Sequence, residues 1–253
     1  MKLIRLQKEG AVAQVIFNRP DVLNAINEEM LQDFHDQLVA LADDREVKVI
    51  VVKGTGRAFS AGIDLKSATA AMFQDQDEGS FMALGLTIRD LIREMPKVVI
   101  GQVHGYCFTG ALELAMFFDL LFCDENTQFG DTHAKWSIIP RWGMSQNLAR
   151  RVGILKAKEL TFRAMRINGI EAARIGLVNT AFSADNLEQE VQTIANEISA
   201  NSFEAIIKIK RLYDDGWHTT LAEGLRIELE TDTSLTATDD QIDQFESKKF
   251  SDK

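Results

Sequence analysis

Short apolar runs alternate with amphipathic helical patterns through the first half of the chain, and this alternation limits the possible folds more than any other feature. The apolar runs are rich in β-branched and aromatic residues and lie at 11–18, 47–52, 98–103 and 119–123. Between them, apolar residues recur at helical spacing over 31–41 and 81–92. Strands that are apolar on both sides are typical of a sheet covered by helices on each face. The pattern therefore predicts an α/β fold.

The pattern changes after about residue 185. Apolar residues at helical spacing predict three helices, over 187–198, 203–213 and 221–229, and no clear strand follows them. We therefore expect an α/β core over residues 1–185 and a C-terminal helical region over residues 186–253 that takes part in packing or oligomerisation. A polar loop is expected over 231–240.

The charge balance excludes several classes of partner. The 253 residues include 28 Lys and Arg against 38 Asp and Glu, a net charge of −10. Such a chain repels nucleic acid and anionic membranes at long range, so neither is an expected partner. The N-terminus lacks an apolar signal stretch, and the longest apolar run, 114–123, is too short to span a membrane. Cys107 and Cys123 lie in apolar surroundings and are expected to be reduced and buried, which favours a cytoplasmic enzyme.

Familiar cofactor and nucleophile motifs are incomplete. The glycines of a phosphate loop at 105–110 are followed by Ala111-Leu112 rather than by Lys-Ser/Thr, and Phe59 replaces the third glycine of a dinucleotide-binding turn. Neither Ser60 nor Ser145 lies in a Gly-x-Ser-x-Gly turn, and the four histidines lack zinc-like spacing. We therefore expect no metal site and no redox cofactor.

Two glycine-bearing segments follow the second and third predicted strands. In the first, residues 56–65, the small residues Ser60, Ala61 and Gly62 let a ligand approach the main chain closely. The next backbone amide, that of Ile63, can point into a cleft.

In the second segment, residues 104–115, a turn runs into an apolar helix that begins near Gly110. The Gly110 amide is then an unpaired helix N-terminal donor, which favours developing negative charge. Glu113 lies three residues further on and projects from the same side of this turn. An oxyanion donor beside a carboxylate suits proton movement next to a thioester carbonyl. A glutamate in the first turn can also stabilise a helix without catalysis, so spacing alone leaves both roles open.

These two segments carry a resemblance to a known family. Ala58-Phe-Ser-Ala-Gly-Ile-Asp-Leu65 and Gly105-Tyr-Cys-Phe-Thr-Gly-Ala-Leu-Glu-Leu-Ala-Met-Phe-Phe-Asp119 resemble the signature segments of the crotonase, or enoyl-CoA hydratase/isomerase, superfamily. Further matches in the same order are Asn18-Arg-Pro-Asp-Val-Leu-Asn-Ala25, Phe129-Gly130, Ile139-Pro140 and Gly176-Leu-Val178. The resemblance implies a crotonase-like spiral of ββα units with a C-terminal helical region. It also implies assembly as a homotrimer or as a hexamer made of two trimers.

The resemblance further implies site residues. The amides of Ile63 and Gly110 match the family's oxyanion hole, and Glu113 matches the first catalytic glutamate of the hydratases. The residues that match segments bordering the substrate and its CoA are Val22, Asn24, Ala25, Ala61, Asp64, Leu65 and Lys66. The partner would be an acyl-CoA thioester, with coenzyme A as part of the substrate and no separate cofactor. In so acidic a chain the CoA phosphates would need nearby cations, for which the candidates are Arg19, Arg57 and Lys66.

One position departs from the family pattern. His133 stands where two-glutamate hydratases carry their second glutamate, after Phe129-Gly130. An imidazole can exchange a proton near neutral pH, so His133 could take over the catalytic role; a structural histidine is the alternative. For the nearby Asp131 we expect a turn or cap role.

The resemblance favours hydration of a 2-enoyl-CoA, with Glu113 activating water. The alternatives are a Δ-isomerase, an acyl-CoA thioester hydrolase and, in a different class, a non-catalytic scaffold that keeps the fold. Trp136 and Trp142 could line the acyl pocket, where large side chains would favour short or flat acyl groups, or could pack in the core or at a subunit contact.

Overall fold

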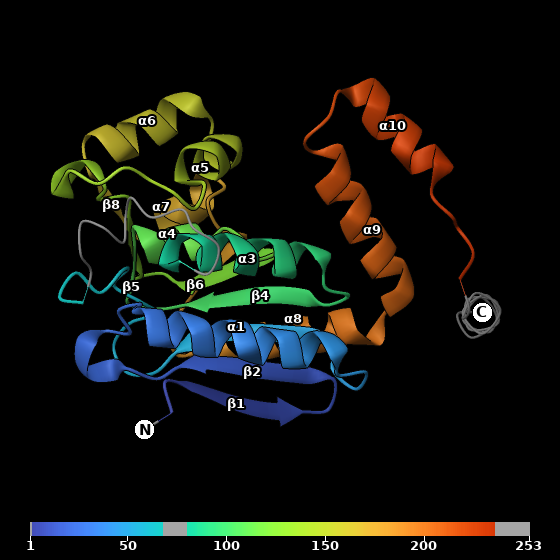
Figure 1. The fold of residues 1–253 in the computed structure, drawn as a ribbon, viewed down its shortest axis with the longest axis horizontal. Helices are drawn as coiled ribbons and strands as arrows, with labels where there is room; N and C mark the ends of the chain where they lie inside the picture. The colour runs from blue at the N-terminus through green and yellow to red at the C-terminus, as the bar shows by residue number, and fades with distance from the viewer. Residues whose placement is uncertain (1, 68–79, 236–253) are drawn as a thin grey trace, which may run out of the picture. The chain divides into compact units, whose positions relative to one another are not determined.

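The computed structural model describes residues 2–67 and 80–235, which divide between two compact units, Met1–Glu197 and Ile198–Lys253. The first unit contains the sheets and the candidate site, and the second contains the last helices (Figure 1). Residues 236–240 of the predicted polar loop lie outside the described residues. None of the described helices is long and apolar enough to cross a membrane.

A mixed sheet forms the centre of the first unit. Its strand order is β1-β2-β3-β4-β6-β9, with β1 antiparallel to β2 and all other neighbours parallel. The bounds are β1 (Ile4–Glu9), β2 (Val12–Phe17), β3 (Val49–Gly54), β4 (Val98–Val103), β6 (Leu120–Asp124) and β9 (Thr180–Phe182). The four predicted strands are thus confirmed as β2, β3, β4 and β6.

Opposite faces of this sheet carry different helices, as the two-residue period of a strand requires. On β2, Ala13, Val15 and Phe17 belong to the core cluster that includes the apolar face of α1 (Glu28–Asp43). Gln14 points the other way and bonds to α8 (Leu187–Ala200) through Gln192. Lys53 of β3 pairs with Glu188 of the same helix. The sheet is therefore covered on both faces, as predicted.

Two helices with defined N-caps cover the core face. The Asn27 side chain accepts a hydrogen bond from the Met30 amide at the start of α1, and Ser80 accepts one from the Ala83 amide at the start of α3 (Phe81–Glu94). These helices pack against each other over the sheet (Figure 1).

A second, smaller sheet has the order β5-β7-β8. The first unit also contains these strands and its remaining helices. Their bounds are η1 (Pro20–Val22), β5 (Tyr106–Phe108), α4 (Gly110–Ala115), β7 (Gln128–Gly130), η2 (Ala134–Trp136), α5 (Met144–Val152), α6 (Ile154–Phe162), β8 (Arg166–Ile167) and α7 (Gly169–Arg174).

The second unit contains α9 (Phe203–Gly216) and α10 (Leu221–Glu230), which pack on each other. Both helices were predicted. The predicted boundary at 185 falls before α8, whereas most of α8 belongs to the first unit, because its contacts with β2 and β3 attach it to the sheet.

Candidate active site

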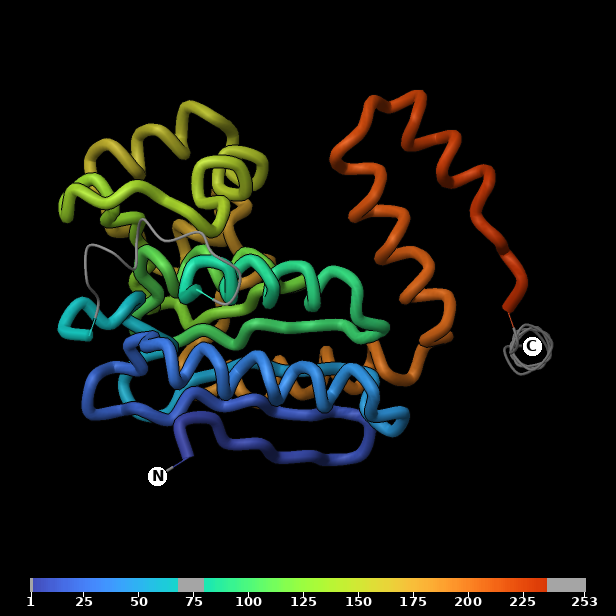
Figure 2. The backbone as a smooth tube through the Cα atoms, in the orientation of Figure 1, coloured from blue at the N-terminus to red at the C-terminus, as the bar shows by residue number. Residues whose placement is uncertain are grey.

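The two loops that match the CoA-bordering segments lie side by side at one end of the sheet (Figure 2). One follows β2 and the other follows β3. The Ala61 amide donates to the Leu23 carbonyl over 2.9 Å, the Ile26 amide donates to the Gly62 carbonyl over 2.8 Å, and the Asp64 amide donates back to Ile26 over 2.9 Å. These two segments, residues 19–26 and 57–66, lie some forty residues apart in the sequence. Together they form one surface, the loop wall.

Asn24 holds this wall together from inside. Its side chain is fully buried, and its amide nitrogen donates to the carbonyls of Thr55 and Ala58 over 2.9 and 2.8 Å, while its amide oxygen accepts from the Arg19 amide. The side chain of Asn24, one of the residues expected to border CoA, is thus bonded within the fold, and the adjacent Ala25 is buried as well.

Arg19 also serves the fold. Its guanidinium donates to the Asp64 carboxylate over 3.0 Å and to the Ala25 carbonyl, and both members of the ion pair are mostly buried. The Arg19 side chain thus braces one loop against the other, with Asp64 as its partner. The members of the predicted set that remain exposed at this wall are Val22, Arg57, Leu65 and Lys66.

Ile63 and Gly110, the predicted oxyanion pair, are neighbours in space. A side-chain carbon placed on Gly110 would lie 2.8 Å from Ile63 Cγ1, and one placed on Gly62 would lie 2.7 Å from the Phe108 carbonyl oxygen. Glycine is therefore needed at both positions for the two segments to approach. Within the described residues, neither the Ile63 nor the Gly110 amide donates to a protein acceptor.

The residue before Gly110 adopts a strained conformation. Thr109 has φ +50° and ψ −111°, which is costly for a β-branched side chain. Its amide donates to the Gly130 carbonyl over 2.9 Å, and its hydroxyl lies 2.5 Å from that of Thr132. These contacts hold the peptide bond that carries the Gly110 amide in one orientation.

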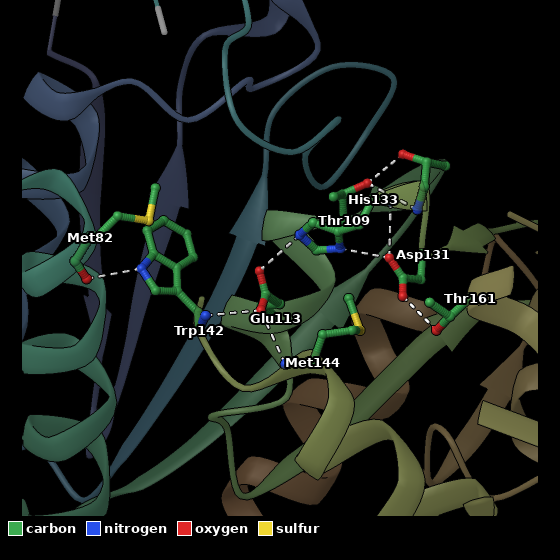
Figure 3. A network of polar contacts seen from close by, with 9 residues as sticks. Met82, Thr109, Glu113, Asp131, His133, Trp142, Met144 and Thr161 are labelled. Atoms are coloured by element: carbon green, nitrogen blue, oxygen red, sulfur yellow. Dashed lines mark hydrogen bonds and ion pairs between the residues drawn. The ribbon is translucent and has the colours of Figure 1, made fainter. Parts of the chain in front are cut away.

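The Glu113 carboxylate is buried, with 2% of its side chain exposed, and its two oxygens have different partners. Oε1 accepts from the amides of Trp142 and Met144, at 3.0 Å each, at the N-terminus of α5. Oε2 faces His133 Nε2 at 3.5 Å (Figure 3). One oxygen therefore fixes the group, and the other is presented to the imidazole.

His133 lies in a buried chain of polar groups. Its Nδ1 is 2.6 Å from Asp131 Oδ1, and the Thr161 hydroxyl donates to Asp131 Oδ2 over 2.6 Å (Figure 3). The His133 amide also donates to Asp131 Oδ1. Asp131 therefore has the expected turn contact and, beyond it, holds the imidazole, a contact that the sequence did not reveal.

The hydrogen bonds among these polar groups shift the pKa values of His133 and Asp131. Burial lowers the pKa of His133, but the hydrogen bonds with Asp131 and Glu113 outweigh burial and raise this pKa to about 9. Burial raises the pKa of Asp131, and the hydrogen bonds from His133 and Thr161 bring it below its usual value. The raised pKa of His133 favours an imidazolium beside Asp131 at neutral pH.

The two tryptophans have different surroundings. Trp136 is 54% exposed on η2, with the Lys135 ammonium 5.5 Å from its ring centre. Trp142 is buried, and its indole nitrogen donates to the Met82 carbonyl of α3 over 3.0 Å. The Trp142 ring is therefore buried beside α3, and its amide bonds to Glu113, whereas the Trp136 ring is exposed and its amide donates to the His133 carbonyl over 3.0 Å.

The sequence model of the family described as enoyl-CoA hydratase/isomerase matches residues 7–251. The chain belongs to this family. It is 35% identical over 239 residues to a crotonyl-CoA hydratase of Syntrophomonas wolfei, covering 94% of this chain and 91% of the relative. It is 33% identical over 240 residues to a short-chain-enoyl-CoA hydratase of Clostridium acetobutylicum, with the same coverage. The crotonase resemblance drawn from the two signature segments is confirmed.

Solved structures agree with the fold. The crystal structure of an enoyl-CoA hydratase from Bacillus anthracis superposes with a TM-score of 0.90 at 25% identity, covering 99% of this chain and 97% of that one. An enoyl-CoA hydratase subunit from Geobacillus kaustophilus superposes with a TM-score of 0.87 at 26% identity, covering 97% and 94%. The predicted α/β fold with a C-terminal helical region is therefore confirmed for this member of the enoyl-CoA hydratase/isomerase family.

Proposed function

We propose that this protein hydrates 2-enoyl-CoA thioesters, and that Glu113 and His133 carry the proton transfers. Family membership and the hydratase names of its relatives support the reaction class. The observation that carries the assignment is the position of the Glu113 carboxylate. It lies on the helix that begins at Gly110, beside Ile63, with one oxygen fixed and the other turned toward His133.

In this mechanism the thioester oxygen accepts hydrogen bonds from the Ile63 and Gly110 amides. Both donors are fixed before charge develops on the enolate oxygen, so they need no reorganisation during the reaction. Removing one such donor typically costs about 2.7–4 kcal/mol of transition-state stabilisation.

Glu113 and His133 then have separate roles. Glu113 Oε2 takes a proton from water as its oxygen bonds to the β-carbon, and the His133 imidazolium gives the α-carbon its proton. The products of these transfers are a neutral carboxylic acid and a neutral imidazole. Because their atoms lie 3.5 Å apart, the proton can return from Glu113 to His133 and restore the starting state.

The exposed residues of the loop wall form the proposed CoA contact. Arg57 and Lys66 provide cations for phosphate oxygens, and Val22 and Leu65 provide apolar surface beside them. The proposal needs no metal and no redox cofactor, since CoA enters as part of the substrate.

The second unit supports self-association. Leu221, Leu225 and Leu229 recur every four residues along α10 and are 80%, 57% and 86% exposed. A row of exposed leucines of this kind is typical of a surface that another protein covers. We propose a homotrimer or hexamer, which light scattering after size-exclusion chromatography will measure. We also propose a cytoplasmic location, in line with two free buried thiols.

Incubation with a four-carbon 2-enoyl-CoA in D₂O tests the reaction directly. The proposal expects a 3-hydroxyacyl-CoA that carries deuterium at the α-carbon. Migration of the double bond without water addition would instead identify an isomerase, and release of free CoA would identify a thioester hydrolase. A folded enzyme that neither adds water nor exchanges α-protons over a range of acyl lengths would contradict the proposal.

A further inference from the structure

The Trp142 indole fills the space between α3 and the start of α4. Its ring nitrogen donates to the Met82 carbonyl over 3.0 Å (Figure 3). Its ring centre lies 5.3 Å from that of Phe81 at a tilt of 44°. Only 1% of the residue is exposed. The indole is thus anchored to α3 by a directed hydrogen bond as well as by packing.

Gly85 of α3 accommodates this ring. A side-chain carbon on Gly85 would lie 2.1 Å from Trp142 Cε2 and 2.2 Å from its Nε1. Glycine is unfavourable inside a helix, yet here any larger residue would displace the indole. Gly85 and Trp142 are therefore a matched pair.

One edge of the buried indole lies close to Gly110 of the candidate site. Trp142 Cζ3 would lie 3.6 Å from a side-chain carbon placed on Gly110, the residue whose amide is proposed to bind the thioester oxygen. The Trp142 backbone amide is bonded to Glu113. The same residue thus bonds to the proposed catalytic carboxylate through its main chain, while its ring lies next to Gly110.

We propose that the Trp142 indole closes the acyl pocket and limits the enzyme to short 2-enoyl-CoA thioesters. This inference rests on the proposed function. An acyl chain whose carbonyl is held at Gly110 and whose β-carbon faces Glu113 meets the indole when it continues toward α3. A longer chain would have to break the bond to Met82 and move a buried ring that has no space behind it, because Gly85 is already in contact.

The ratio of kcat/KM for a four-carbon and a ten-carbon 2-enoyl-CoA measures this effect. The wild-type protein is expected to prefer the four-carbon thioester by at least about tenfold, and Trp142→Ala to shift the ratio toward the ten-carbon thioester by about tenfold or more. Trp136→Ala is the matched control, since that ring is exposed on η2, and it should leave the ratio unchanged.

Gly85→Ala tests the pair from the other side. The added methyl group should push the indole toward Gly110 and lower kcat/KM even for the four-carbon thioester. The double variant Gly85→Ala/Trp142→Ala should recover activity, which a general folding defect would not do. If Trp142→Ala does not fold, the Gly85→Ala variant and Trp142→Leu test the pocket assignment in its place.

The outcomes separate the two proposals. If the wild-type protein hydrates both thioesters equally well, or if Trp142→Ala and Trp142→Leu hydrate them in the wild-type ratio, the pocket assignment is wrong while the hydratase assignment stands. If the folded wild-type protein hydrates no 2-enoyl-CoA of any length, the proposed function fails and the pocket assignment fails with it.

Discussion

Replacing Asp131 by Asn should move the alkaline limit of activity to lower pH. The substitution keeps the size of the side chain next to His133 Nδ1 and removes the negative charge that lies 2.6 Å away. The mechanism needs His133 protonated, and its raised pKa of about 9 depends on this hydrogen bond and on the one to Glu113. Asp131 would then act as a positioning residue, because it reaches the substrate only through His133.

The magnitude follows from the burial of the pair. His133 and Asp131 are 3% and 1% exposed, so solvent screens their interaction little. A hydrogen bond to a charged group contributes about 1.5–3 kcal/mol, and one pKa unit corresponds to about 1.4 kcal/mol. The pKa of His133 should therefore fall from about 9 to roughly 7–8.

The assay is the pH dependence of kcat/KM for a four-carbon 2-enoyl-CoA. The wild-type rate should decline above about pH 9, whereas the Asp131→Asn rate should decline above roughly pH 7–8 and approach the wild-type rate near pH 6. Thr161→Val is the matched control: it removes the bond to Asp131 Oδ2 but keeps the charge, so its limit should move less. An Asp131→Asn profile that is lowered equally at every pH, with its alkaline limit unmoved, would refute the reasoning.

Three further predictions concern the backbone and the charge of the site. Gly62→Ala should lower kcat/KM by about 10²–10³-fold with a smaller effect on KM. The reason is that the new carbon would lie 2.7 Å from the Phe108 carbonyl oxygen and would move the Ile63 amide. An unchanged kcat would contradict the assignment of Ile63 to the oxyanion hole. The Thr109→Gly variant should have a higher free energy of unfolding than Thr109→Ala by about 1 kcal/mol or more, because only glycine adopts a positive φ without strain. Chemical denaturation measures this difference. The reverse order would mean that the backbone at residue 109 is not strained. The raised pKa of His133 stabilises the fold fully below about pH 6.5, and this contribution is lost as pH rises through about 9. The thermal unfolding midpoint of the wild-type protein should therefore fall as pH rises toward 9, and that of Asp131→Asn should fall less. The same dependence of the midpoint on pH in both proteins would contradict this prediction.

The sequence predicted the elements whose signal is local and strong. The runs that became β2, β3, β4 and β6 are nearly all buried, so they read as apolar throughout. In β1 only Ile4 is buried, and the strands of the second sheet have two or three residues each. Neither kind leaves a periodic pattern that sequence analysis can detect.

The same distinction holds at the site. Gly110 and Glu113 are related by one helical turn, so their spacing was enough to place the carboxylate near the amide. The pairing of His133 with Glu113 depends on how the segment after β7 folds back over α4, which no local pattern specifies. The Asp131-Thr-His133 spacing was a usable signal, because a carboxylate two residues before a histidine can reach its ring.

Contacts between distant loops could not be predicted. The sequence offered Arg19 as a candidate cation for the CoA phosphates, and the family resemblance placed Asn24 in a CoA-bordering segment. Their partners, Asp64 for Arg19 and the carbonyls of Thr55 and Ala58 for Asn24, lie about thirty to forty-five residues away in the chain. Tertiary structure therefore decides which polar groups of the loop wall remain available to a ligand.

The most direct test of the account is the hydration of a four-carbon 2-enoyl-CoA by Glu113→Gln. Glutamine keeps an oxygen that can accept from the Trp142 and Met144 amides, so the site should stay folded while the base is lost. Glu125→Gln, at an exposed position, is the control and should retain the wild-type rate. We predict that Glu113→Gln lowers kcat/KM by about 10²–10⁴-fold; a folded variant that adds water at the wild-type rate would contradict the assignment of Glu113 as the catalytic base.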